Sequence, residues 1–156
     1  MRVALYEPDI PQNAGAIMRT AACLGVTVDL IEPCGFLLGD RQLRRAGMDY
    51  LDKLVLNRHS SWDVFKDARR QAAEGRLVLL TTRAELPYTD FRFMPGDVLM
   101  VGRESSGVPE TVHAAVDASV VVPMTPGSRS LNVAVAVAMV LGEALRQTGA
   151  LRAPAQ

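Results

Sequence analysis

Apolar residues occur along the chain in short, nearly continuous runs, and segments with helical spacing separate these runs. The runs are rich in Val, Leu and Ile, as is typical of strands that are buried on both faces of a parallel sheet. They cover residues 2–8, 27–33, 76–82, 97–102 and 119–124. The segments between and after them predict helices over 13–24, 61–74, 108–115 and 131–147. This alternation predicts an α/β fold with a mostly parallel sheet and flanking helices.

The last predicted helix is ambiguous, because Val and Ala alternate over 133–140 as they would in a strand. The apolar character continues to Leu145 without a helix breaker, which is too long for a typical strand and favours a helix. Ser130 or Asn132 is a suitable N-cap, and Arg146 suits the last turn. The small residues of this helix would let another helix approach closely, either in the core or at a subunit interface.

The length of 156 residues predicts one domain over 1–150, followed by a loose tail over 151–156. The composition is that of a globular protein, with 49% hydrophobic and 22% charged residues. Seventeen basic residues balance 17 acidic ones, so a nucleic-acid partner would require a local basic patch. Cys23 and Cys34 suit neither a disulfide framework nor a zinc site, and no apolar run is long enough to span a membrane. We therefore expect a soluble, cytoplasmic protein that binds no metal.

Three of the predicted strands lead into loops rich in Gly, Pro and polar residues. These loops are "TTRAELP" after Leu80, "GRESSGVPE" after Val101 and "MTPGSRSLN" after Val122. Each alone would be an ordinary surface turn, but ligands of open α/β sheets bind beyond the carboxyl ends of the strands. We therefore expect the three loops to form one site.

The kind of ligand is narrowed by the motifs that the chain lacks. It contains neither G-x-G-x-x-G nor G-x-x-x-x-G-K-[ST], so a phosphate-bearing nucleotide is not indicated. "GRESSG" misses the hydrolase spacing G-x-S-x-G by one residue. The pattern favours a ligand without phosphates, held by backbone groups and loop hydroxyls.

Two basic features lie outside these loops. In the first predicted helix, Asn13 is a plausible N-cap and Gly25 a plausible C′ residue. Arg19 lies opposite the apolar stripe of this helix, beside small residues that would let a ligand approach. The stripe consists of Ala14, Ile17, Met18 and Ala21.

Within 40–53, a second group of basic residues occupies one helical face and consists of Arg41, Arg44 and Arg45. Such a face is normally solvated, and an RNA partner would make it a phosphate-binding patch.

Three segments, taken in order, resemble the motifs of the SpoU (TrmH-like) branch of the SPOUT RNA methyltransferases. They are "NAGAIMRTAACLG" (13–25), "LMVGRESSGVPE" (99–110) and "VVVPMTPGSRSLNVAVAVAMVLGEAL" (120–145). The connecting segments "YEPDIPQN", "LRRAGMDY" and "LTTR" are similar to the single-domain TrmL subgroup, which methylates the ribose 2′-hydroxyl of tRNA nucleotide 34. The resemblance implies an α/β-knot (SPOUT) fold with a C-terminal trefoil knot, which general rules of topology would not predict.

The resemblance also implies the cofactor S-adenosylmethionine, a tRNA substrate and a homodimer. The modified nucleotide would be cytidine 34, together with carboxymethylaminomethyluridine, of leucine tRNAs. The implied cofactor-binding residues are Leu80, Gly102, Val122, Met124, Ser130 and Leu131. The implied catalytic set is Asn13, Arg19, Glu104, Ser130 and Asn132. Because a guanidinium, with a pKa above ~12, is a poor proton acceptor, we expect Arg19 to bind the target phosphate and orient the hydroxyl. The implied RNA contacts are Arg19, Arg41, Arg44 and Arg45.

Three other functions stay open. The same chemistry at another tRNA position or in ribosomal RNA is the nearest. A catalytically silent RNA-binding module is a second, although such a module would not need the complete catalytic set. A small-molecule methyltransferase is a third, and it would leave the cationic face within 40–53 without a role.

Overall fold

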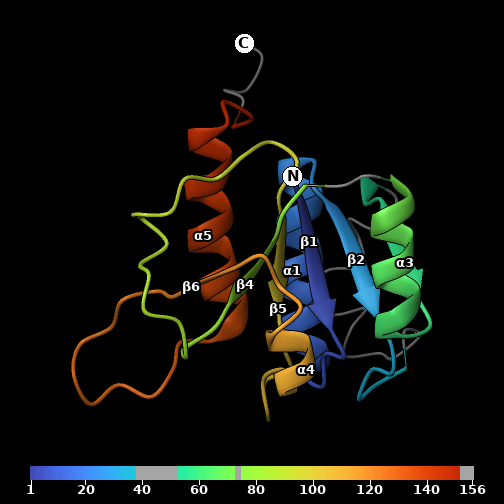
Figure 1. Cartoon of the computed structure of the whole chain (residues 1–156), viewed down its shortest axis with the longest axis horizontal. Helices are drawn as coiled ribbons and strands as arrows, with labels where there is room; N and C mark the ends of the chain where they lie inside the picture. Colours follow the sequence, from blue (N-terminus) through green and yellow to red (C-terminus); the bar gives the residue numbers. More distant parts are fainter. Residues whose placement is uncertain (38–52, 73–74, 152–156) are drawn as a thin grey trace.

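The computed structural model describes residues 1–37, 53–72 and 75–151 (Figure 1). Its strands are β1 (Arg2–Tyr6), β2 (Thr27–Ile31), β3 (Leu56–His59), β4 (Leu77–Leu80), β5 (Val98–Val101) and β6 (Ala118–Val120). Its helices are α1 (Pro11–Leu24), α3 (Trp62–Ala72), α4 (Glu110–His113) and α5 (Val133–Gln147). Within these ranges the strands form one six-stranded sheet in the order β3-β2-β1-β5-β4-β6, and every neighbouring pair is parallel. The predicted α/β architecture is confirmed.

The strands are buried on both faces, which explains their nearly continuous apolar sequences. Successive side chains of a strand point to opposite faces, and β1 illustrates this. Val3 and Leu5 belong to the core formed with α1 and α5, whereas Ala4 and Tyr6 belong to the core that contains Phe65 of α3. Helices therefore cover both faces of the sheet.

The predicted helix over 131–147 is confirmed, with its first helical residue at Val133. The N-cap is Asn132, whose Oδ1 accepts hydrogen bonds from the backbone N–H groups of Ala134 and Val135. Of the two predicted N-cap candidates, Ser130 and Asn132, the second is therefore the one that caps α5. Arg146 lies in the last turn as expected, and its guanidinium binds the Glu143 carboxylate one turn earlier.

The prediction that Asn13 caps α1 is wrong. The helix begins at Pro11, after the N-cap residue Ile10, which makes no side-chain capping bond. Pro is well suited to the first position of a helix, because its fixed φ is already helical and the first N–H needs no partner within the helix. Asn13 thus lies inside the first turn and binds other elements. The C-terminal prediction is confirmed, since Gly25 adopts a left-handed conformation with φ 67°.

The remaining differences concern short or polar elements. Most of the predicted strands extend past the observed ends into adjoining loops, whereas α1 and β6 begin before their predicted starts at residues 13 and 119. The sequence did not predict β3, because Asn57 and Arg58 interrupt the apolar pattern of this edge strand. The proposed cationic face of Arg41, Arg44 and Arg45 lies outside the described residues. The implied trefoil knot stays a prediction, because strand order and pairing do not test it.

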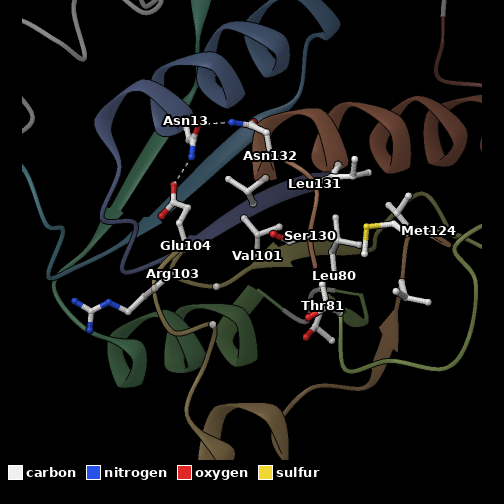
Figure 2. Close-up of a pocket in the computed structure, with 17 residues that line it drawn as sticks. Asn13, Leu80, Thr81, Val101, Arg103, Glu104, Met124, Ser130, Leu131 and Asn132 are labelled. Carbon is white, nitrogen blue, oxygen red and sulfur yellow. Dashed lines mark hydrogen bonds between the residues drawn. The ribbon is translucent and has the colours of Figure 1, made fainter. Parts of the chain in front are cut away.

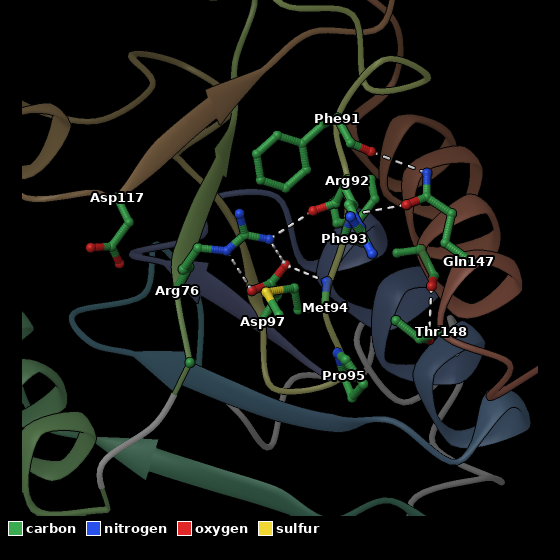
Figure 3. Close-up of polar contacts among 12 residues, drawn as sticks. Arg76, Phe91, Arg92, Phe93, Met94, Pro95, Asp97, Asp117, Gln147 and Thr148 are labelled. Carbon is green, nitrogen blue, oxygen red and sulfur yellow. Dashed lines mark hydrogen bonds and ion pairs between the residues drawn. The ribbon is translucent and has the colours of Figure 1, made fainter.

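The long connection between β4 and β5 is fixed to the sheet and to α5 (Figure 3). The Arg76 guanidinium binds the buried Asp97 carboxylate, with its Nη2 2.8 Å from Oδ2, and lies over the Phe91 ring. On the other side, Gln147 Oε1 accepts the Phe93 N–H at 2.9 Å, and Gln147 Nε2 donates to the Phe91 carbonyl at 3.1 Å. These contacts hold a connection whose first residues belong to the site described next.

Candidate active site

The three polar loops meet at the carboxyl end of the sheet, as predicted, and line a pocket of about 300 Å³ (Figure 2). The ends of β4 and β5 and the residues after β6 supply apolar side chains, which are Leu80, Val101 and Val122. The first turn of α5 adds Val133 and Ala136. The loops add Thr81, Thr82, Gly102, Arg103, Glu104, Gly107, Met124, Ser130, Leu131 and Asn132.

The pocket contains most of the residues that the family resemblance implied. All six implied cofactor residues line it: Leu80, Gly102, Val122, Met124, Ser130 and Leu131. Four of the five implied catalytic residues also line it: Asn13, Glu104, Ser130 and Asn132. The fifth, Arg19, lies on an exposed part of α1 and is not among the lining residues. The pocket thus unites four of the five polar groups of the implied catalytic set.

The segment "GRESSG" places Glu104 in the pocket by folding back on itself. Arg103 and Gly107 exchange backbone hydrogen bonds of 3.0 and 2.8 Å, which close a tight turn. Gly107 has φ +68°, a conformation that a side chain would strain. A Cβ at Gly102 would lie 2.6 Å from the carbonyl carbon of Gly107, so the close approach of the returning chain requires glycine there.

A chain of side-chain hydrogen bonds joins three separate elements at the edge of this pocket. Glu104 Oε1 accepts from Asn13 Nδ2 at 3.2 Å, and Asn13 Oδ1 accepts from Asn132 Nδ2 at 2.9 Å. Figure 2 shows both bonds between the β5 loop, α1 and the start of α5. Asn132 therefore caps α5 and also lines the pocket.

The Glu104 carboxyl is the only carboxyl group among the lining residues. Burial, and then a hydrogen bond with the Asp9 carboxylate, raise the pKa of Glu104 above its ordinary value. The same hydrogen bond is the main reason why the pKa of Asp9 is lowered to about 2. The sequence contained Asp9 in the segment "YEPDIPQN" but did not mark it as a site residue. Its position just after a buried strand, at the same edge as the other loops, was the available signal.

The lining suits a ligand that carries an apolar ring, hydroxyl groups and no phosphate. Apolar side chains form much of the wall, and Thr81, Thr82 and Ser130 offer hydroxyls. The only basic side chain among the lining residues, Arg103, binds Glu7, with Nη1 3.3 Å from Oε2. Figure 2 shows the Arg103 side chain directed away from the other labelled residues. Among the described residues that line the pocket, no cationic group is therefore left unpaired for a nucleotide phosphate.

The described residues form neither a metal-binding cluster nor a membrane-spanning helix. Across 1–37, 53–72 and 75–151, no three His, Cys, Asp or Glu side chains gather closely enough to hold a metal ion. None of the helices in those same ranges has both the length and the apolarity to span a bilayer. The cysteines Cys23 and Cys34 are free.

The parallel sheet, the pocket beyond its carboxyl ends and the order of the motifs together define an RNA methyltransferase. The chain belongs to the SpoU rRNA Methylase family, whose sequence model matches residues 1–142. Within this family it is similar to a protein of Beijerinckia indica subsp. indica named tRNA (cytidine(34)-2′-O)-methyltransferase. The two are 61% identical over 149 residues, which cover 96% of this chain and 92% of that protein.

Two solved structures are similar to most of this chain. One comes from work described as "Structural insights into the 2-OH methylation of C/U34 on tRNA". It has a TM-score of 0.88 and 43% identity and covers 94% of each chain. The other is the SpoU methyltransferase AviRb from Streptomyces viridochromogenes in complex with the cofactor AdoMet. It has a TM-score of 0.85 and 29% identity, and the match covers 94% of this chain and 57% of that one.

Proposed function

We propose that this protein transfers a methyl group from S-adenosylmethionine to the ribose 2′-hydroxyl of nucleotide 34 of tRNA. The observation that carries the proposal is the 61% identity to a tRNA (cytidine(34)-2′-O)-methyltransferase over nearly the full length of both chains. The pocket supports it, because the polar residues shared with the family lie together there. The nucleotide is cytidine, and the modified uridine of leucine tRNAs is a further substrate.

S-adenosylmethionine is the cofactor, and its sulfonium makes the methyl group electrophilic and provides the leaving group. With that cofactor bound, transfer would form a bond from the ribose 2′-oxygen to the methyl carbon, break the carbon–sulfur bond and release the hydroxyl proton to solvent. The protein therefore has to align the hydroxyl and favour the departure of its proton. The apolar wall formed by Leu80, Val122 and Leu131 holds the cofactor, and Ser130 and Glu104 bind its polar groups or the ribose.

Arg19 has a role outside this pocket. It lies on an exposed part of α1, the same helix that carries Asn13 into the site. A guanidinium binds a phosphate through two parallel N–H donors and keeps its proton at neutral pH. Arg19 therefore binds a phosphate next to the target nucleotide and orients the 2′-hydroxyl. Arg41, Arg44 and Arg45 contact other tRNA phosphates.

The working form is a homodimer that forms through α5. Two large apolar side chains at a spacing of four residues are exposed on this helix: Val135 (51%) and Met139 (40%). A spacing of four residues places them along one side of the helix. A second copy would bury this row, and Gly142 has open space around the position of a Cβ, which allows close approach. The enzyme acts in the cytoplasm, where its tRNA substrate occurs.

A second function, methylation of ribosomal RNA, is favoured by one observation. The family model that matches residues 1–142 is named for rRNA methylases. The chemistry would be the same and only the RNA would differ. Because this chain covers 92% of the tRNA-modifying relative, that relative is the nearer guide to the substrate.

The deciding experiment is methyl transfer from labelled S-adenosylmethionine to tRNA from a strain that lacks the gene, with the modified nucleotide mapped. A 2′-O-methyl group at nucleotide 34 is expected. A 2′-O-methyl group elsewhere, or only in ribosomal RNA, would overturn the assigned position. Binding of the cofactor without transfer to any RNA would support the silent module instead.

A further inference from the structure

Asp9, which lies outside the pocket, forms hydrogen bonds with both the carboxyl group and the backbone of Glu104. Asp9 lies between β1 and α1, and its backbone N–H donates to Glu104 Oε2 at 3.1 Å. In return, Asp9 Oδ1 accepts the backbone N–H of Glu104, also at 3.1 Å. Ser105 adds two bonds to Asp9 Oδ2, one from its Oγ and one from its backbone N–H. Two segments that are 95 residues apart are thereby tied together at the edge of the site.

These hydrogen bonds fix the orientation of the Glu104 carboxyl as well as its position. Oε2 is held by Asp9, and Oε1 accepts from Asn13 Nδ2 at 3.2 Å. Rotation of the carboxyl would break at least one of these bonds. Asn13 in turn binds Asn132. A displacement of Asp9 would therefore reach the N-terminus of α5 through Glu104 and Asn13.

Asp9 is itself held by the sheet. The backbone N–H of Gly35, in the segment after β2, donates to the Pro8 carbonyl at 2.9 Å. A Cβ at Gly35 would lie 2.8 Å from the Asp9 Cα, so the backbones are packed without space for a side chain. The position of Asp9 is thus set by close packing between the segments that follow β1 and β2, two paired strands of the sheet.

We propose that Asp9 is a positioning residue of the methyl-transfer reaction and that it acts through Glu104. Asp9 does not line the pocket, whereas Glu104 does. The inference rests on the proposed function, since it takes Glu104 to be part of the methyl-transfer site. It assigns to the segment "YEPDIPQN" the task of holding the Glu104 carboxyl in one place and one orientation.

The electrostatics agree with this assignment and supply a readout. Burial is the main reason why the pKa of Glu104 is raised, and the bond with the Asp9 carboxylate is the second. From α1 the uncharged Asn13 faces Glu104, and the nearby Arg103 is bound to Glu7. Replacing Asp9 by Asn removes the second cause and leaves the first, so the pKa of Glu104 should fall.

The kinetic test compares Asp9→Asn, Glu104→Gln and the double variant with the full-length enzyme. For Asp9→Asn we expect kcat to fall about tenfold, because an amide nitrogen in place of Oδ2 cannot accept the bonds from Ser105 that hold Asp9 against Glu104. The KM for tRNA and the Kd for S-adenosylmethionine should change less than about twofold. In the Glu104→Gln background, Asp9→Asn should have no further effect, because contacting residues that act as a unit are not additive. Full additivity of the two substitutions would overturn the inference.

A titration provides a second test that does not depend on turnover. The pKa of the Glu104 carboxyl is followed by ¹³C NMR in the wild type, Asp9→Asn, Ser105→Ala and Ser106→Ala. Ser105→Ala removes only the Oγ bond to Asp9 and gives a milder variant if Asp9→Asn folds poorly. The neighbouring Ser106→Ala is the matched control and should leave kcat and the pKa unchanged. An unchanged pKa in both Asp9→Asn and Ser105→Ala would overturn the inference.

The two proposals fail in different ways. A wild-type protein that methylates no RNA would overturn the proposed function, and the titration would still decide whether Asp9 governs Glu104. A wild-type protein that methylates tRNA, combined with an Asp9→Asn variant of full kcat, would overturn the role of Asp9 alone.

Discussion

Asn132 Nδ2 donates a hydrogen bond to Asn13 Oδ1 at 2.9 Å and thereby joins the N-termini of α5 and α1. The same Asn132 side chain caps α5 through Oδ1. The two functions use different atoms of one amide group. Substitutions can therefore separate them.

Asn132→Asp should keep the cap and lose the bond to Asn13. Aspartate is as good an N-cap as asparagine, so the free energy of unfolding should stay within about 0.5 kcal/mol of the wild type. A carboxylate cannot donate to Asn13 Oδ1, and turning the Asn13 amide to meet it would take the donor away from Glu104. We expect kcat to fall about tenfold or more, because the polar groups lose their alignment.

Asn132→Ala is the companion variant, since it removes both functions. It should lose about 1 kcal/mol of stability in urea denaturation in addition to the loss of kcat. Full turnover of Asn132→Asp would mean that Asn132 acts only as a cap.

The sequence predicted the parts of the fold and site that depend on periodic patterns or on strand ends. The buried stripe Ala14, Ile17, Met18 and Ala21 is confirmed. The meeting of the three loops is confirmed as well, because the carboxyl ends of parallel strands lie at one edge. Gly25 follows from the need for a left-handed residue after α1.

Features that depend on partners distant in the sequence were not predicted. Nothing local shows that Asp9 meets Glu104, and the frequency of Asn at helix N-caps wrongly favours Asn13 as the cap of α1. Pro11 already indicated an earlier start of α1, since proline favours the first helical position. The strand β3 has a polar sequence and is held by backbone pairing with β2, which a side-chain pattern does not reveal.

Arg19→Ala should impair methyl transfer without affecting the cofactor pocket. Loss of a charge-assisted phosphate contact should lower kcat/KM for tRNA by about tenfold to hundredfold. The slope of log KM against log salt should change by about one unit. The Kd for S-adenosylmethionine, measured calorimetrically, should stay the same because Arg19 does not line the pocket.

Arg19→Lys and a matched surface variant complete this test. Lysine keeps the charge but not the planar fork, so we expect an intermediate loss. Near-full turnover of Arg19→Lys would show that charge alone matters. Arg70→Ala removes an exposed arginine from α3 and should leave kcat/KM unchanged.

Val135→Glu should convert the proposed dimer into a monomer. Val135 is 51% exposed on α5, and a second copy packed on this helix would bury the new carboxylate without a partner. Sedimentation velocity at micromolar concentration measures the result. Val64→Glu on α3, where Val64 is 47% exposed, is the matched control and should stay dimeric. A monomeric wild type, or a dimeric Val135→Glu, would contradict the α5 interface.

Asp29→Ala should destabilise the fold. The Asp29 carboxylate is completely buried in the sheet, where it binds the Arg2 guanidinium and His59 Nε2, the latter at 2.8 Å. Asn57 Nδ2 also donates to it at 3.2 Å. Its removal leaves these partners without their shared acceptor, and breaking a buried charge pair typically costs about 3–5 kcal/mol.

The effect of Asp29→Ala should be confined to stability, because neither Asp29 nor its partners line the pocket. Urea denaturation measures the loss, and calorimetry under folding conditions should give an unchanged Kd for S-adenosylmethionine. Asp67→Ala on α3 is the control. It removes an exposed carboxylate that binds Arg70, and it should change stability by less than about 0.5 kcal/mol. An equal effect of the two substitutions would show that the buried position of Asp29 contributes nothing to the stability of the fold.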